Sequence, residues 1–194
     1  MDYSAILRKR RTIRFYKQMN VAEKHLLKMV SAALHAPSGA NNQPLRYTVV
    51  RNQDLVQAVF YHTSYGGRVK PRRSPEWNFN APTAFIAVSA VKNTPAINPM
   101  VYADAGAAIM SMQFAAVEEN LGTCWIGAFN AKEVTKLLAI DEKEQLLFLL
   151  AVGHPAENPV EEEIDRNGSV AYYLDEYDRL HVPKYSLESV TRIL

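Results

Sequence analysis

Two short segments that are apolar almost without interruption constrain the fold of this chain more than any other feature. They cover residues 83–91 and 146–152, and the first of them is also partly β-branched. Both have the length and composition of buried strands. A sheet built from such strands must be covered on its two faces, which favours a layered arrangement around it.

Helices and strands are mixed along the rest of the chain. Helices are predicted where apolar side chains recur at helical spacing, and Asn52 and Asn130 are suitable N-caps. No repeat or linker divides the sequence, so we expect one domain over residues 1–194 of the α+β class, a sandwich around a central, mainly antiparallel sheet. The expected helices are 2–9, 22–36, 54–61, 102–121, 131–138 and a short one from 186; the further strands are 46–51 and 123–128; the loops are 62–82, 93–99 and the acidic stretch 154–168, with a turn at 153–155.

Charge balance and cysteine content exclude several classes of protein. There are 22 Lys and Arg against 20 Asp and Glu, so no global field directs the chain to nucleic acid or to an anionic membrane. The single cysteine, Cys124, lies in an apolar strand as an inert thiol and fits a reducing compartment. His25, His35 and His62 lack the spacing of metal ligands. Without a signal core or a membrane-length apolar run, we expect a soluble, cytoplasmic protein with no metal.

A loop at residues 36–44 is stiff and rich in hydrogen-bonding groups. Two prolines punctuate it, and Ser38, Asn41, Asn42 and Gln43 offer both donors and acceptors. This mixture favours a flat heterocycle with carbonyls and ring nitrogens over a phosphate, which needs only donors. The alternative is an ordinary surface turn.

Basic residues gather in two places, at residues 8–14 and 68–73. On their own they indicate a solvated face or a nucleic-acid patch. The second cluster follows two glycines and is a candidate for a mobile lid that attracts the phosphates of a ligand. Its members are Arg68, Lys70, Arg72 and Arg73.

Four features follow one another in a fixed order along the chain. They are the basic run 10–15, the loop 36–44, the stretch from Asp104 to residues 121–129, and residues 150–155 with the basic tail 179–184. Together they resemble the FMN-dependent nitroreductase family from residue 3 to the end of the chain. The resemblance implies a nitroreductase-like α/β/α sandwich that forms a homodimer with exchanged terminal segments and two FMN sites at the subunit interface.

The resemblance assigns cations from both ends of the chain to FMN. Arg10 is expected to hold the phosphate, with Thr12 and Arg14 along the ribityl chain and the pyrimidine edge; Arg11 adjoins them. Near the C-terminus, basic phosphate ligands of the family correspond to Arg179 and His181. His181 replaces the commoner arginine, and a neutral imidazole donates a hydrogen bond without supplying charge.

The amide-rich loop and one turn complete the implied site. The loop is expected to come from the partner subunit and to contact the flavin ring and ribityl groups through Pro37, Ser38, Gly39, Asn41 and Gln43. The turn at Gly127 and Ala128 matches the family position for the backbone N–H that faces flavin N5. No protein side chain is assigned as catalytic, because the cofactor carries the chemistry.

The implied function is an oxidoreductase in which NADH or NADPH reduces FMN, which then reduces a nitroaromatic, quinone or similar small acceptor in a ping-pong cycle. Alternatives are the same fold with reductive dehalogenation, dehydrogenation or flavin fragmentation, a non-enzymatic flavin-binding protein, or a small basic nucleic-acid binder. The sequence leaves open the physiological acceptor, the preference between NADH and NADPH, and whether His181 contacts the phosphate.

Overall fold

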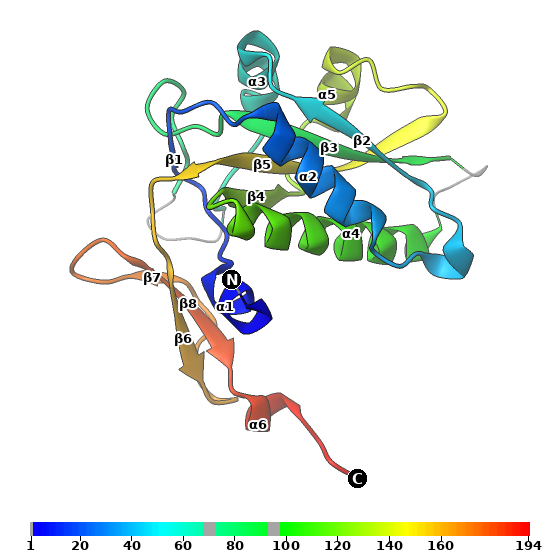
Figure 1. Cartoon of the computed structure of the whole chain (residues 1–194). Helices are drawn as coiled ribbons and strands as arrows, with labels where there is room; N and C mark the ends of the chain where they lie inside the picture. Colours follow the sequence, from blue (N-terminus) through cyan, green and yellow to red (C-terminus); the bar gives the residue numbers. More distant parts are fainter. Residues whose placement is uncertain (1, 68–72, 93–97) are drawn as a thin grey trace.

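The computed structural model describes residues 2–67, 73–92 and 98–194. Its central sheet contains β1 (Tyr16–Lys17), β2 (Leu45–Val50), β3 (Ala84–Val91), β4 (Gly122–Ile126) and β5 (Glu144–Pro155). β5 pairs with β3 along one edge and with β4 and β1 along the other, and β2 pairs with the outer edge of β3 (Figure 1). All of these pairs are antiparallel, which confirms the predicted α+β fold with a mainly antiparallel central sheet.

Helices cover both faces of this sheet, as the two uninterrupted apolar segments required. α2 (Glu23–Leu34) and α4 (Pro99–Glu118) lie on one face, and α3 (Gln53–Phe60) and α5 (Ala131–Leu137) lie on the other (Figure 1). Successive side chains of β3 point to opposite faces. Ile86 and Val88 therefore join the cluster under α2 and α4, while Phe85 and Ala87 join the cluster under α3 and α5.

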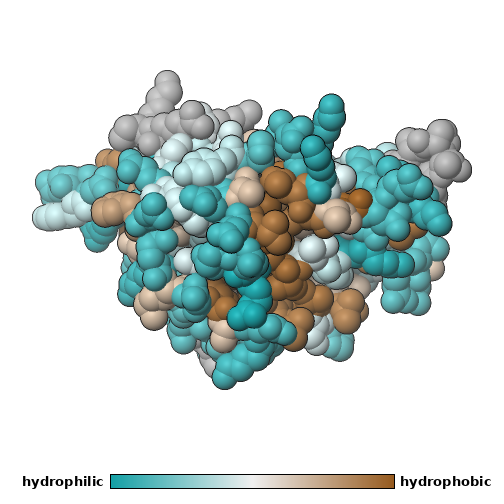
Figure 2. All heavy atoms as spheres, turned by 90° about the horizontal axis from the view of Figure 1, so that it is seen from above, coloured by the Kyte–Doolittle hydropathy of each residue, from teal (hydrophilic) through white to brown (hydrophobic). Residues whose placement is uncertain are grey.

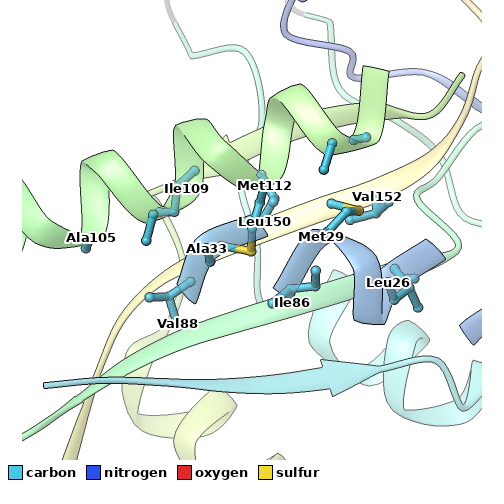
Figure 3. Close-up of a cluster of buried hydrophobic side chains, with 14 of the residues drawn as sticks. Leu26, Met29, Ala33, Ile86, Val88, Ala105, Ile109, Met112, Leu150 and Val152 are labelled. Carbon is cyan, nitrogen blue, oxygen red and sulfur yellow. The ribbon is translucent and has the colours of Figure 1, made fainter. Parts of the chain in front are cut away.

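The larger cluster sits between α2, α4 and the sheet. Met29 of α2 and Met112 of α4 are fully buried and meet Leu150 of β5 (Figure 3). By length and composition alone α4 could cross a membrane, but 50% of its apolar window is buried inside the protein. In this fold α4 serves as a core helix.

Local signals set the helix boundaries where the sequence placed them. The Asn52 side chain accepts the Leu55 N–H at 3.1 Å and caps α3, and the Asn130 side chain accepts the Glu133 N–H at 3.3 Å and caps α5. α4 begins three residues earlier than the predicted 102, because Asn98 caps it by accepting the Met100 N–H at 2.9 Å.

The C-terminal region differs from the prediction. The stretch 154–168, expected to be a loop, contains β6 (Val160–Ile164), which pairs in parallel with β8 (Leu180–Tyr185); β7 (Tyr173–Leu174) pairs antiparallel with β8. This second sheet lies beside α1 (Tyr3–Lys9), away from α3 and α5, and is followed by α6 (Leu187–Val190) (Figure 1). Acidic side chains on β6 conceal the strand from a search for apolar runs.

The predicted turn at 153–155 is also wrong, since β5 continues through these residues to pair with β1. Gly153 permits this pairing by close approach. A Cβ at Gly153 would lie 2.7 Å from a ring carbon of the buried Tyr16. The glycine is therefore required by packing against β1 and not by a turn.

Candidate functional site

The N-terminal cations lie between the end of α1 and β1. Arg11 is largely buried; its guanidinium forms an ion pair with Glu161 at 2.5 Å and donates to the carbonyls of Arg8 and Arg10. Arg10 is half-buried, and both desolvation and the neighbouring Arg11 lower its pKa, while Glu161 opposes the shift. Arg11 is thus engaged within the protein. Arg10 has no carboxylate within ion-pair distance among the described residues.

A buried carboxylate, that of Glu157, fixes the backbone at Arg14. Glu157 accepts the N–H of both Arg14 and Phe15, the latter at 3.1 Å, and forms an ion pair with Arg73 at 3.0 Å. The Arg14 guanidinium lies 5.9 Å from the ring centre of Tyr172. Like Arg10, it has no ion-pair partner in the part of the chain that the structure describes.

For Arg73, the expectation of a mobile basic lid is wrong. Its side chain is 8% exposed, it stacks over Phe15 with 4.4 Å between guanidinium carbon and ring centre, and it also approaches Asp178 at 3.6 Å. An arginine fixed in this way cannot attract NADPH. The remaining members of that cluster, Arg68, Lys70 and Arg72, lie outside the described residues.

The C-terminal cations converge on one carboxylate. Asp175 receives the Arg179 side chain at 2.7 Å and the His181 ring at 3.2 Å, and His181 stacks on Tyr173 with 4.6 Å between ring centres. Desolvation raises the pKa of Asp175, but the hydrogen bonds from Arg179 and His181 outweigh it and hold that pKa well below its usual range. An arriving phosphate would have to compete with Asp175 for the side chains of both Arg179 and His181.

The loop 36–44 has an unusual backbone, with a 3-10 turn, η1 (Gly39–Asn41), at its centre. Ala40, Asn41 and Gln43 all have positive φ, at 50°, 54° and 45°. For a residue other than glycine this conformation costs about 1–2 kcal/mol, with Asn tolerating it best. The alternative prediction, an ordinary surface turn, does not account for three such residues in one loop.

Hydrogen bonds hold this loop in shape. The Gly39 N–H donates to the Asp104 carboxylate at 3.0 Å, and the Gln43 N–H donates to the Ser38 hydroxyl at 3.1 Å. The Gln43 side-chain amide donates to the Asn41 carbonyl oxygen at 3.1 Å. The side chains of Asn41 and Gln43 are exposed.

β4 ends at Ile126, two residues before the predicted end of that strand. The turn that follows it is exposed at Gly127 and Ala128. The Ser64 N–H donates to the Ala128 carbonyl at 2.9 Å and fixes the turn. Beside it, Trp125 is 39% exposed and meets Phe148 edge to face at 5.1 Å. Such an apolar surface next to a backbone turn suits a planar ligand.

Cys124 lies within β4, and Thr12 lies beside it. Cys124 is buried, and desolvation raises its pKa to about 11, so the thiol is inert at neutral pH as expected. The Thr12 backbone forms an isolated bridge with Thr123, which places the N-terminal segment beside β4.

The structure brings some of the predicted residues together and separates others. Residues 10–14 and the strand carrying His181 meet around residues 157–161, through Glu157, Glu161 and the pairing of β6 with β8. The loop 36–44 lies at the N-terminal end of α4, while α1 lies beside its C-terminal half (Figure 1). One chain therefore does not join the loop to the N-terminal cations.

Sequence reasoning missed two supporting residues, Asp104 and Glu157. Both are buried carboxylates that accept backbone N–H groups of predicted site segments, over separations of 65 and 142 residues. The sequence shows that a carboxylate lies within a predicted helix or loop. It does not show which backbone N–H, so far away in the chain, that carboxylate will accept.

Comparison with known proteins identifies relatives that cover most of this chain. A protein of Methanothermobacter thermautotrophicus, named as a candidate NADH dehydrogenase/NAD(P)H nitroreductase, is 27% identical over 189 residues, which cover 95% of this chain and 88% of that protein. The structure of a candidate nitroreductase from Desulfovibrio desulfuricans in complex with FMN matches with a TM-score of 0.64 and 29% identity, over 80% of this chain and 87% of that one.

A second structure, described as an FMN-dependent nitroreductase from Clostridium difficile, matches with a TM-score of 0.66 and 25% identity, over 80% of this chain and 88% of that one. The sequence model of the nitroreductase family matches residues 7–154. This range includes the N-terminal cations, the loop 36–44 and the turn after β4. The chain belongs to the nitroreductase family.

Proposed function

We propose that this protein is an FMN-dependent oxidoreductase that uses NADH or NADPH to reduce nitroaromatic, quinone or similar small acceptors in a ping-pong cycle. One observation carries the proposal. Among the described residues, Arg10 and Arg14 have no carboxylate partner, whereas Arg11, Arg73 and Arg179 each have at least one. A phosphate with close to two negative charges is the kind of group that two such arginines bind well.

The residues of the N-terminal segment fit FMN in the order in which they lie. Arg10, at the end of α1, is half-buried and would bind the phosphate. Thr12 lies beside β4 and would contact the ribityl chain. Arg14, fixed through its backbone by Glu157, would lie at the pyrimidine edge and stabilise negative charge there.

The C-terminal cations would complete the phosphate site. Arg179 is 54% exposed and can turn from Asp175 towards an anion without breaking a buried contact. His181 is more enclosed, and its Nε2 faces Asp175. We therefore expect Arg179 to contribute more to FMN binding than His181 does.

The loop 36–44 would reach the flavin of a partner subunit, because its own chain holds it apart from the cations. The exposed amides of Asn41 and Gln43 would contact the ring and ribityl groups, with Pro37, Ser38 and Gly39 shaping the approach. The backbone of Gly127 and Ala128 would face the ring on the other subunit. These roles require a homodimer in which each site draws on both chains.

Exposed apolar side chains support the homodimer. Leu27 and Leu34 on α2 are 52% and 71% exposed, and Tyr3 on α1 is 65% exposed. Figure 2 shows a hydrophobic strip among hydrophilic atoms on the face seen from above. Contiguous apolar surface of this kind is typical of an interface.

The chemistry of the proposed reaction belongs to FMN, which when bound takes a hydride from the nicotinamide and passes electrons to the acceptor. The chain binds and orients it. Arg14 favours the electron-rich form of the ring by its charge, and a backbone N–H at the Gly127 turn would orient the reactive edge. Trp125 and Phe148 would keep water from the adjacent ring face.

The test is an absorbance spectrum of freshly purified protein, followed by anaerobic titration with NADH and with NADPH. We expect a yellow dimer that bleaches with at least one nicotinamide and is reoxidised by a nitroaromatic or a quinone. A colourless monomer that takes up no added FMN would contradict the proposal. Bound flavin that neither nicotinamide bleaches would favour another flavin reaction or a non-enzymatic role.

Single substitutions test the residue assignments. Arg10→Gln and Arg14→Gln should each weaken FMN binding by about tenfold or more, since each removes a charge-assisted contact. Arg51→Gln is the matched control, because Arg51 is exposed and pairs with Glu23 far from the site. Unchanged FMN affinity in both site variants would show that other cations bind the phosphate.

A further inference from the structure

The loop 36–44 holds a conformation that its sequence does not favour. Three of its residues other than glycine, at 40, 41 and 43, have left-handed backbone conformations. Such residues persist only where the surroundings determine them, and they gather at ligand-binding segments. Something outside the loop must therefore stabilise it.

Packing supports the loop only in part. An open pocket of about 120 Å³ lies between the loop, the end of α2 and the start of β2, and Ser38, Gln43 and Asp104 are among the residues that line it. On the side of α4 the loop comes close to a side chain, that of Met100 near Gly39. Hydrogen bonds are therefore needed to hold the shape of the loop.

These hydrogen bonds differ in what they can fix. The contacts of Gln43 with Ser38 and Asn41 lie within the loop and move with it. The end of the loop is fixed where the Val91 N–H donates to the Pro44 carbonyl at 3.0 Å. Gln43 is also held from β2, where the Arg46 guanidinium donates to its carbonyl at 3.2 Å. The start of the strained stretch is tied to the rest of the protein by another contact, which involves α4.

That contact is made by Asp104, in the second turn of α4. Its side chain is buried, and its carboxylate accepts the N–H of Gly39 at 3.0 Å. Gly39 directly precedes Ala40, the first left-handed residue. Because α4 is a core helix of 20 residues, Asp104 offers a rigid anchor at the point where the strain begins.

We propose that Asp104 is a positioning residue that holds the flavin-contacting loop in its bound shape, an inference that rests on the function proposed above. Asp104 does not touch the flavin in this scheme. It keeps residues 40–43 in the left-handed conformation before FMN arrives, so that the loop need not be ordered on binding. The carboxylate thereby determines how well the exposed amides of Asn41 and Gln43 meet the ligand.

The main test measures FMN binding by quenching of flavin fluorescence on the full-length protein. Asp104→Ala removes the acceptor and should raise the FMN dissociation constant about 10- to 100-fold. Asp104→Asn keeps a side-chain oxygen for the Gly39 N–H and should stay within about threefold of the wild type. Glu118→Ala is the matched control, because it removes from the helix of Asp104 an exposed carboxylate, which pairs with Lys28 of α2.

A second variant distinguishes positioning from a general loss of structure. Ala40→Gly relieves the left-handed strain, since glycine adopts this conformation without a Cβ penalty. In the Asp104→Ala background it should recover most of the lost FMN affinity. Amide hydrogen exchange at Gly39, measured without flavin, should be faster in Asp104→Ala than in the wild type.

The outcomes are separable. Wild-type FMN affinity and wild-type Gly39 exchange in Asp104→Ala would overturn the inference. So would an Asp104→Asn variant as weak as Asp104→Ala, because a lost charge and not a lost acceptor would then be responsible. If the wild type takes up no FMN, the proposed function fails, and the exchange of Gly39 alone decides whether Asp104 holds the loop.

Discussion

The two sheets of this protein are stabilised in different ways. The central sheet is apolar, and the side chains of Phe85, Ile86 and Leu150 are fully buried. The C-terminal sheet is cross-linked by polar contacts, such as Tyr173 with Glu162 at 2.6 Å and His181 with Asp175 at 3.2 Å. The central sheet should therefore respond mainly to changes in packing, and the C-terminal sheet mainly to changes in charge.

A buried ion pair joins the two regions. Arg73 pairs with Glu157, which follows β5, and approaches Asp178 just before β8. Glu157 also holds the backbone of Arg14 and Phe15. The cations proposed for FMN thus lie where a packed sheet meets a charged one.

The largest effect is expected from the central sheet. Phe85→Ala should lower the free energy of unfolding by about 3–5 kcal/mol, because it opens a cavity in a fully buried part of the core. Denaturant unfolding measures the change. Phe79→Ala is the control, since Phe79 is 75% exposed and its loss should cost less than about 0.5 kcal/mol. Similar losses in both variants would contradict the contrast between buried and exposed apolar side chains.

The ion pair between the regions should give the next largest effect. Arg73→Met leaves the buried Glu157 carboxylate without its cation and should cost about 3 kcal/mol of unfolding free energy. Arg51→Met, which breaks the exposed pair with Glu23, should cost less than about 1 kcal/mol. Equal costs in the two variants would show that burial does not distinguish the pairs.

The contrast between the sheets also explains how far the fold could be predicted from the sequence. Residues 83–91 and 146–152 carry their own burial signal, so β3 was predicted almost to the residue, whereas β5 begins two residues earlier and ends three residues later than predicted. β6 and β8 have acidic, basic and proline residues and are strands because they pair with each other. Their register depends on a partner about 20 residues away, which no local pattern reveals.

The candidate site also contains residues that the sequence indicates and residues whose role only the tertiary structure reveals. The residue types of the loop 36–44 indicated a ligand because amides show their chemistry in the sequence, whereas the run 10–14 was assigned to FMN only through the resemblance to the family. The supporting contacts of Asp104 and Glu157 depend on tertiary structure. The basic cluster 68–73 shows the opposite error, since Arg73 is an arginine that the fold has buried.

The two sheets should respond to opposite extremes of pH. In the central body, desolvation raises the pKa of Cys124 to about 11 and that of Tyr16 well above 10. The fold therefore favours the neutral forms, and their contribution is complete below the ordinary pKa values of about 9–10 and is lost as pH rises from these towards the raised values of the folded protein. We expect the denaturation midpoint of the central sheet to fall between about pH 9 and pH 11. A constant midpoint over that range would contradict this.

The smallest effect is expected from acid on the C-terminal sheet. Desolvation raises the pKa of Asp175, but the hydrogen bonds from Arg179 and His181 hold it below 3.8, its ordinary value. Because the folded pKa is the lower one, the charged carboxylate stabilises the fold above the unfolded pKa, and this contribution is lost as pH falls through the folded value. Amide exchange in β7 and β8 should therefore accelerate as the pH falls below about 4, while β3 stays protected.

In Asp175→Asn the exchange of β7 and β8 should already be fast at pH 6 and should change less with acid. If acid instead releases both sheets together, the charged contacts around Asp175 do not control the C-terminal sheet separately, and the two regions unfold as one cooperative unit.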